Sequence, residues 1–297
     1  MKKNIKTLSA AALAFTCVLG GCGGEKAKTI DFEENYTVAK AAALNVANVE
    51  ESTEGFFISM DFDMVMKAKY QGMDMNVVVE MDIYINHVGD NYYMESRTSM
   101  FGEEQIVGAA VEKKADGTYD AYSWMPDYYS EDGDMMYAKQ NIPASEMEDF
   151  DEMFEIEEAN FGIQDIFSVD FANIETAMRT AIVELMEDDT FSDLPITLGG
   201  AEDLVITKKA TEKDGKKTFK VTAELPSQVE GEELSITFGI VIDGEALDSL
   251  IMNMSGKGSM DGVTMSYEAD VTQKIEAAGR TDAKYSSIPQ NVTWIEE

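Results

Sequence analysis

The sequence contains few cysteine, proline and histidine residues, and cysteine and histidine are side chains on which many catalytic and metal sites depend. Of its 297 residues, two are cysteine, five are proline and one is histidine. A single imidazole excludes a His-Glu-x-x-His zinc site and makes any Ser-His-Asp arrangement depend on one residue, His87. Because His87 closely precedes Gly89-Asp90 at the end of a predicted hairpin, we expect it to be a solvent-facing turn residue.

Other catalytic and ligand-binding motifs are absent as well. The chain contains no Ser-x-x-Lys or Gly-x-Ser-x-Gly sequence, no phosphate-binding P-loop and no dinucleotide glycine fingerprint. Gly256-Lys257-Gly258 is not followed by a predicted helix, so it is interpreted as a bulge or turn between strands. The sequence therefore predicts a protein that is not an enzyme and that needs no cofactor and no metal.

Methionine, in contrast, is abundant, with twenty residues. Thioether sulfurs are soft ligands, so closely spaced methionines raise the question of copper(I). The pairs concerned are Met64 and Met66, Met73 and Met75, and Met252 and Met254. In each pair both side chains fall on the apolar face of one predicted strand, where packing explains them without a metal.

The N-terminus has the features of a secretion signal. Three early lysines precede an apolar run from about 8 to 19, which is shorter than the roughly 20 residues that cross a bilayer. Leu19-Gly20-Gly21-Cys22 resembles the lipobox of bacterial lipoproteins. The resemblance implies cleavage after Gly21 and attachment of diacylglycerol to Cys22; the alternative is an ordinary signal with a chance cysteine. Cys17 lies within the signal and is lost with it, so no disulfide is expected.

Acidic residues far outnumber basic ones, 57 against 23, which gives a formal net charge of −34. Removal of residues 1–21 takes away three lysines and leaves −37. This charge excludes nucleic acid as a partner. Anionic headgroups would repel such a domain, so we expect residues 22–30 to act as a lipidated tether, of which 23–30 can span roughly 27 Å. We predict an exported protein anchored to the outer face of the cytoplasmic membrane, or to a periplasm-facing membrane in a host with two.

The rest of the chain, 31–297, is predicted to be one domain of the α+β class with mainly antiparallel strands. Apolar residues at helical spacing predict a helix over 31–50. Alternating apolar residues, one phase over 56–70 and the other over 73–85, predict a long hairpin that turns at Gln71-Gly72. Further strands are expected at 91–100, 105–114, 118–125, 134–139, 203–211, 217–225, 234–243, 247–258 and 262–274, with a short last strand near Val292 and Trp294.

A helical insertion interrupts these strands at about 143–190. Met147, Phe150 and Phe154 punctuate an acidic run, and Phe171 begins a helical stripe that continues through Ile174 and Met178. We therefore expect two helices here. Many consecutive strands are joined by short turns, which disfavours a parallel, doubly wound sheet and a two-lobed solute-binding protein.

The lipobox, the leading helix and the long methionine-rich hairpins, including the run from Ser59 to Met64, are together similar to the LolA/LppX-like superfamily of lipoprotein carriers and lipid-binding lipoproteins. The resemblance covers most of 31–297 and includes no invariant motif. It implies a strongly curved, incomplete β-barrel, or half-barrel, with helices packed on its concave face and acyl chains held beneath them.

Two functions follow from this pattern. The first is a non-enzymatic lipoprotein that binds an acyl chain, a lipid or a lipidated protein, because methionine is flexible and suits irregular apolar ligands. The second is a surface scaffold whose methionines fill the core and whose acidic helices dock a protein partner, which the sequence does not identify. The candidate ligand-lining residues share the apolar face of the predicted strands: Phe56, Ile58, Met60, Phe62, Met64, Met66, Met75, Val77, Val79, Met81, Met252, Met254 and Met265.

The lipid anchor can be tested directly. We expect intact-mass measurement of the membrane-extracted protein to show a chain that begins at Cys22 and carries diacylglycerol, and Cys22→Ala to abolish this modification. Cys17→Ala is the matched control and should leave the mature mass unchanged. A mature chain whose mass lacks any lipid would contradict the prediction.

Overall fold

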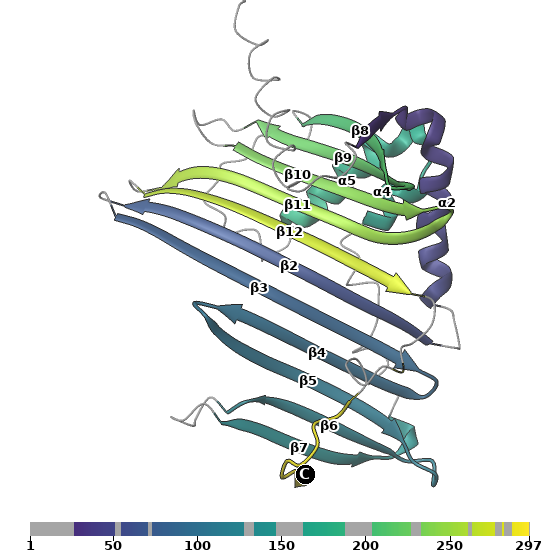
Figure 1. The fold of residues 1–297 in the computed structure, drawn as a ribbon, viewed down its shortest axis with the longest axis vertical. Helices are drawn as coiled ribbons and strands as arrows, with labels where there is room; N and C mark the ends of the chain where they lie inside the picture. The colour runs from purple at the N-terminus through teal and green to yellow at the C-terminus, as the bar shows by residue number, and fades with distance from the viewer. Residues whose placement is uncertain are drawn as a thin grey trace, which may run out of the picture.

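A computed structural model describes residues 27–50, 55–70, 73–127, 134–146, 163–187, 204–226, 233–260, 263–276, 281 and 287–296. Within these ranges the strands form a single thirteen-stranded sheet (Figure 1) in the order β1-β8-β9-β10-β11-β12-β2-β3-β4-β5-β6-β7-β13. All neighbouring strands are antiparallel except β13, which runs parallel to β7. The predicted antiparallel α+β class is therefore confirmed, and the order excludes two separate α/β lobes within the described part of the chain.

The sheet consists of two meanders. The first contains β2 (Gly55–Tyr70), β3 (Met73–Val88), β4 (Asn91–Met100), β5 (Glu103–Lys113), β6 (Tyr119–Pro126) and β7 (Met135–Ile142). The second contains β8 (Val205–Lys213), β9 (Lys216–Pro226), β10 (Glu233–Asp243), β11 (Ala246–Met260) and β12 (Val263–Glu276). They join where β12 pairs with β2 over fourteen residue pairs, from Val263↔Tyr70 to Glu276↔Phe57. Short strands β1 (Lys28–Ile30) and β13 (Ile295–Glu296) lie at the two edges.

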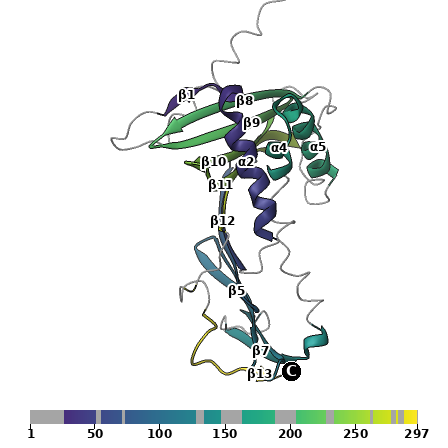
Figure 2. The same ribbon diagram turned by 90° about the vertical axis from the view of Figure 1, so that its right-hand side faces the viewer.

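Helices α2 (Phe32–Glu50), α4 (Ile163–Ser168) and α5 (Ile174–Glu187) pack on one face of the β8–β12 part of the sheet (Figure 2). Short 3-10 turns, η1 (Ala144–Glu146) and η4 (Phe171–Asn173), complete the described helical structure. The Tyr36 hydroxyl on α2 donates to the carbonyl oxygens of Phe167 and Val169, and this ties α2 to α4. No helix in the described ranges is long and apolar enough to cross a membrane.

The main core lies between these helices and the sheet. Ala39, Ala42 and Ala43 let α2 approach closely, and Phe219 and Ile240 on the facing strands are fully buried. Phe32 meets the edge of the Phe219 ring with centroids 5.4 Å apart. Burial of this apolar surface is the dominant stabilising contribution, at about 25 cal/mol per Å². We call this side of the sheet the apolar face.

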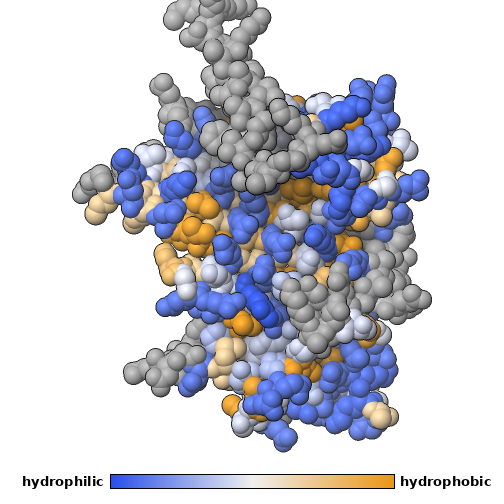
Figure 3. Space-filling model, in the orientation of Figure 1, coloured by the Kyte–Doolittle hydropathy of each residue, from blue (hydrophilic) through white to orange (hydrophobic). Residues whose placement is uncertain are grey.

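A second cluster lies on the opposite face, toward β13. Tyr93, Ala110 and Trp124 are buried there, and Trp294 from the C-terminal segment packs edge-on against Tyr122. Figure 3, in the view where the strands lie in front of α4 and α5, shows hydrophilic and hydrophobic side chains intermixed on this face. The opposite face therefore has its own small core and is otherwise mostly polar.

The structure also corrects some expectations from sequence. Gly256 is neither in a turn nor at a bulge, because β11 runs through it in regular register with β12. A Cβ at Gly256 would lie 2.4 Å from the Tyr267 ring, so a close approach of that ring explains the glycine. The strand β1 was missed, since three residues carry too little alternation to be recognised.

The remaining predicted elements were mostly found. Helix α2 matches the predicted 31–50, and each predicted strand from 56 to 274 has a counterpart with bounds within a few residues. In the 143–190 region, α5 confirms the stripe that includes Ile174 and Met178. The signal, Gly21, Cys22, the Gln71-Gly72 turn and the run from Met147 to Phe154 lie outside the described residues.

The assignment of the two faces makes a stability prediction for β9. Phe219→Ala should lower the free energy of unfolding by about 3–5 kcal/mol, because it opens a cavity beneath α2. The adjacent Thr218→Ala, on the opposite face, should change it by less than about 1 kcal/mol. Urea unfolding followed by circular dichroism measures both, and equal effects would show that the helices do not cover the Phe219 side.

Candidate functional site

The candidate site is the apolar face of the four central strands β11, β12, β2 and β3. Cross-strand pairs point to the same side of a sheet, so the register shows which side chains share a face. Phe62 pairs with Met81 on β3 and with Val271 on β12, which in turn pairs with Met252 on β11. Met265 pairs with Ala68, which pairs with Met75. By this register, all thirteen residues predicted to line a ligand lie on one continuous face.

Coverage of this face changes along the strands. At the end where β2 begins, Phe56, Ile58 and Met60 are buried in the core with the helices, as is Met252. Toward the end of β2 at Tyr70 the side chains become exposed, with Met66 at 36% and Met75 at 56% of full exposure. The other predicted lining residues have intermediate exposure. We call these two parts the covered end and the open end.

Two polar side chains of β12 lie on this face without hydrogen-bond partners. Gln273 is 1% exposed, sits between Met60 and Leu250, and both polar atoms of its amide are unpaired. The Tyr267 hydroxyl, farther toward the open end, is also buried and unpaired. Because an unsatisfied buried polar group costs about 1–3 kcal/mol, both are available for a polar group of a bound molecule or for water. Sequence analysis did not single out either residue, although both belong to the alternating set of β12.

Two hollows, both open to solvent, lie toward the end of the sheet at which Tyr70 pairs with Met73. One, of about 480 Å³, is lined by three residues of the apolar face, Ala68, Met75 and Met265, and by seven polar residues of the opposite face, which include Lys67 and Lys69.

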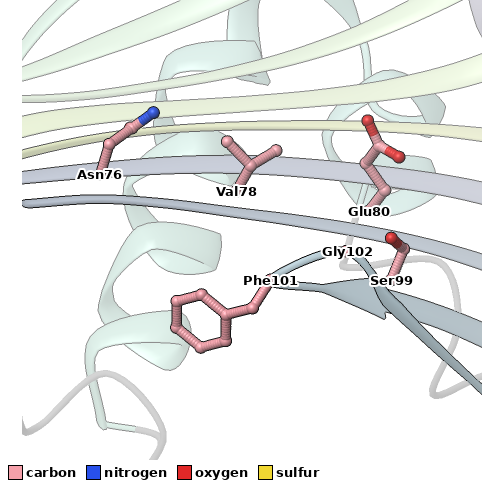
Figure 4. A pocket seen from close by; sticks show the side chains of 6 residues that line it. All are labelled: Asn76, Val78, Glu80, Ser99, Phe101 and Gly102. Atoms are coloured by element: carbon pink, nitrogen blue, oxygen red, sulfur yellow. The ribbon is translucent and has the colours of Figure 1, made fainter.

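The other hollow, of about 270 Å³, lies between β3 and the β4–β5 turn on the face opposite the apolar face. Figure 4 shows Asn76, Val78 and Glu80 on β3 with Phe101 extending from that turn. Phe101 is 73% exposed and has a φ of 56°, which is uncommon for an aromatic residue. This end of the sheet therefore presents large apolar side chains to solvent.

His87 differs from its prediction. It lies within β3 and is partly buried on the apolar face, not in a solvent-facing turn. Its ring stacks on Tyr92 with centroids 4.1 Å apart and meets the edge of Phe56 at 5.3 Å. The strand continues one residue beyond His87, which places the ring among aromatic neighbours.

No group of three or more His, Cys, Asp or Glu side chains is arranged to hold a metal ion within the part of the chain that the structure describes. The position of the methionines on the sheet bears on the copper(I) alternative. Met64 and Met66 share the apolar face with Met75, as predicted, and they line a broad surface of strands. Their arrangement is the one expected for an apolar surface.

Comparison with known proteins gives limited similarity. No family model matches the chain, and no curated protein matches it. Among solved structures, the crystal structure of a DUF1329 family protein from Desulfovibrio piger shares 9% identity, covers 85% of this chain and 97% of its own, and superposes with a TM-score of 0.19. A similarity of this size does not extend to function.

The unpaired Tyr267 hydroxyl predicts a specific pH dependence. Burial raises its pKa to about 12 from 10.0. Below pH 10 the tyrosine is protonated in both the folded and the unfolded chain. Between pH 10 and 12 only the unfolded chain ionises, so the free energy of unfolding falls as the pH rises. Tyr267→Phe should remove that loss and raise the free energy of unfolding at pH 7 by about 1–3 kcal/mol.

Urea unfolding of wild type and Tyr267→Phe at pH 7 and pH 11 measures both effects. A variant less stable than wild type at pH 7 would show that the hydroxyl has a partner in solution.

Proposed function

We propose that the mature chain is a membrane-anchored, extracytoplasmic lipoprotein without enzymatic activity, which binds an acyl chain of a lipid or of a lipidated protein on its apolar face. The observation that carries the proposal is the continuous apolar face across β11, β12, β2 and β3, covered at one end and open at the other. The anchor is the predicted lipid on Cys22. Exposed apolar surface of this extent is characteristic of interaction sites.

The dimensions of the face suit an extended hydrocarbon chain. From Met60 to Tyr70 on β2 the strand advances about 33 Å at 3.3 Å per residue, which exceeds the length of a sixteen-carbon chain. Methionine side chains adapt to an irregular ligand at little cost, because they are unbranched and flexible.

The orientation of the ligand follows from the two unpaired polar groups. An acyl chain on a purely apolar surface gains no directional contact, whereas an ester or carboxyl group can accept a hydrogen bond from Tyr267 or Gln273. We place the polar group of the ligand near Tyr267, because this residue lies nearer the open end. The hydrocarbon chain then runs along the Met64 and Met66 row.

The finer fold proposed here is an incomplete barrel of the LolA/LppX-like kind, in which the sheet curves around its helices. The support is a single antiparallel sheet, bent where β8–β12 pass α2, α4 and α5 (Figure 2). In this arrangement the helices limit how far an acyl chain extends toward the covered end. An apolar site bounded by helices is consistent with a carrier or lipid-binding role.

A scaffold that docks a protein partner is the second candidate function, and the covered end favours it. Phe56, Ile58 and Met60 are each less than 8% exposed, so this part of the face is a filled core. This candidate requires the side chains along the whole face to be buried in the same way, so that the methionines serve packing alone. The chain would then display its surface to another protein.

A binding experiment separates the two. We expect native mass spectrometry of the chain expressed from Gly23 to show co-purified lipid, and a fluorescent fatty acid to bind. Met75→Glu should weaken this binding at least about tenfold, because it places a carboxylate on the ligand surface.

The matched control is Val78→Glu, which puts the same charge on the same strand but on the opposite face, at a position 41% exposed. It should bind the fatty acid as wild type does. A clean apo mass with no fatty-acid uptake would exclude the binding function and leave the scaffold. Equal loss in both variants would place the ligand elsewhere.

A further inference from the structure

Basic side chains gather at one edge of this acidic protein. Residues 28–30 and 205–226, which form β1, β8 and β9 with their connecting turn, carry seven lysines against three acidic residues. The whole chain has 23 basic against 57 acidic residues. The charge of this edge is therefore opposite in sign to that of the protein as a whole.

Four of these lysines lie on the same face of two neighbouring strands. Lys209 pairs directly with Lys220, and Lys213 pairs with Lys216, with Thr211 and Thr218 between the two pairs. This is the face opposite the helices, since the alternate residue Phe219 points into the core. We call Lys209, Lys213, Lys216 and Lys220 the basic face. Like charges directly opposite each other on a sheet are destabilising, so the arrangement calls for an explanation.

The neighbours of the basic face neutralise only part of it. Lys216 forms ion pairs with Asp248 at 2.5 Å and with Asp243 at 3.8 Å. Lys220 extends over Gly239 and donates to Asn253 at 3.2 Å. Lys209 and Lys213 are exposed to solvent. The two outermost lysines are thus directed into the surrounding medium.

Protection of a sheet edge does not account for this pattern. Lysines on edge strands prevent unwanted pairing with other chains, and Lys209 and Lys213 fit that role because they flank the three residues of β8 that β1 covers. Lys216 and Lys220, however, belong to β9, which is paired with β8 on one side and β10 on the other. A binding partner of negative charge explains both strands.

The position of the basic face relative to the lipid anchor indicates that partner. Strand β1 pairs with β8, with Lys28 opposite Glu212. Only residues 23–27 separate Cys22 from Lys28, and the step from one to the other spans about 20 Å when extended. If Cys22 is lipidated, as in the proposed function on which this step rests, the basic face cannot lie far from the headgroups.

We propose that the basic face binds the anionic phospholipid headgroups of the membrane that holds Cys22, and that this contact orients the protein with β1 and β8 toward the bilayer. The thirteen strands extend about 58 Å from β1 to β13 at about 4.8 Å per strand. Since charges are screened over about 8 Å at physiological ionic strength, the acidic residues of distant strands do not cancel the local attraction. In this orientation the remaining strands extend away from the membrane.

Lysine footprinting of the mature chain in vesicles tests this contact. The protein is reconstituted in vesicles of phosphatidylcholine alone or with about one-third phosphatidylglycerol, acetylated briefly and analysed by mass spectrometry. On the anionic vesicles we expect acetylation of Lys209 and Lys213 to fall at least about fivefold. The attraction of one lysine to an anionic surface changes the binding equilibrium by about this factor. The protection should disappear at high salt.

Lys67 and Lys69 are the internal controls, because both are exposed on β2 on the same face as Lys209 and Lys213. Their acetylation should be equal on the two kinds of vesicle. In variants, Lys209→Glu with Lys213→Glu should abolish the protection of Lys216, whereas Lys67→Glu with Lys69→Glu should leave Lys209 and Lys213 protected. Equal labelling of Lys209 and Lys213 on neutral and anionic vesicles would overturn the proposal.

The mass of the N-terminal peptide in the same samples separates this proposal from the proposed anchor. If Cys22 is acylated but Lys209 and Lys213 are labelled equally on both vesicles, the anchor stands and the basic-face contact fails. If Cys22 carries no lipid, the anchor fails, and the same labelling of chain added to preformed vesicles decides the contact. Protection on anionic vesicles then supports it, and its absence overturns it.

Discussion

The structure depends on the period-two alternation of side chains, held in register across neighbouring strands. Because Phe62 faces Met81 on one side and Val271 on the other, a shift of one residue in any of these strands would move its apolar side chains to solvent. The fourteen pairs between β12 and β2 make this register continuous through the middle of the sheet. The main core and the open apolar end depend on that alignment, whereas the basic face depends on the pairing of β8 with β9.

Local sequence patterns predicted the strands and helix α2, because long alternation and helical spacing are local properties. The same patterns predicted that Met64, Met66 and Met75 would share a face. They did not predict which part of that face the helices cover, since this depends on where α2 and α4 pack after folding. Gly256 was misassigned for a similar reason: the ring that explains it, Tyr267, belongs to the next strand.

Polar residues within the apolar alternation were the hardest to interpret from sequence. Gln273 follows Val271 in the alternating set, and sequence alone gives no indication that its amide lacks a partner. The basic face was hidden for a different reason, because a net charge of −34 conceals seven lysines on three adjacent strands. Pairing of β1 with β8 is a long-range contact, and it brings residues 28–30 to those lysines.

The junction between the two meanders also constrains how the protein forms. Strand β2 stands near the beginning of the chain, but its neighbour β12 ends at Glu276, so the centre of the sheet cannot close until nearly the entire polypeptide has emerged. Pairings between such distant segments fold slowly, since the entropy of closing a long loop is lost before the contacts form. A chain of this design therefore keeps the centre of its sheet unpaired until late in synthesis.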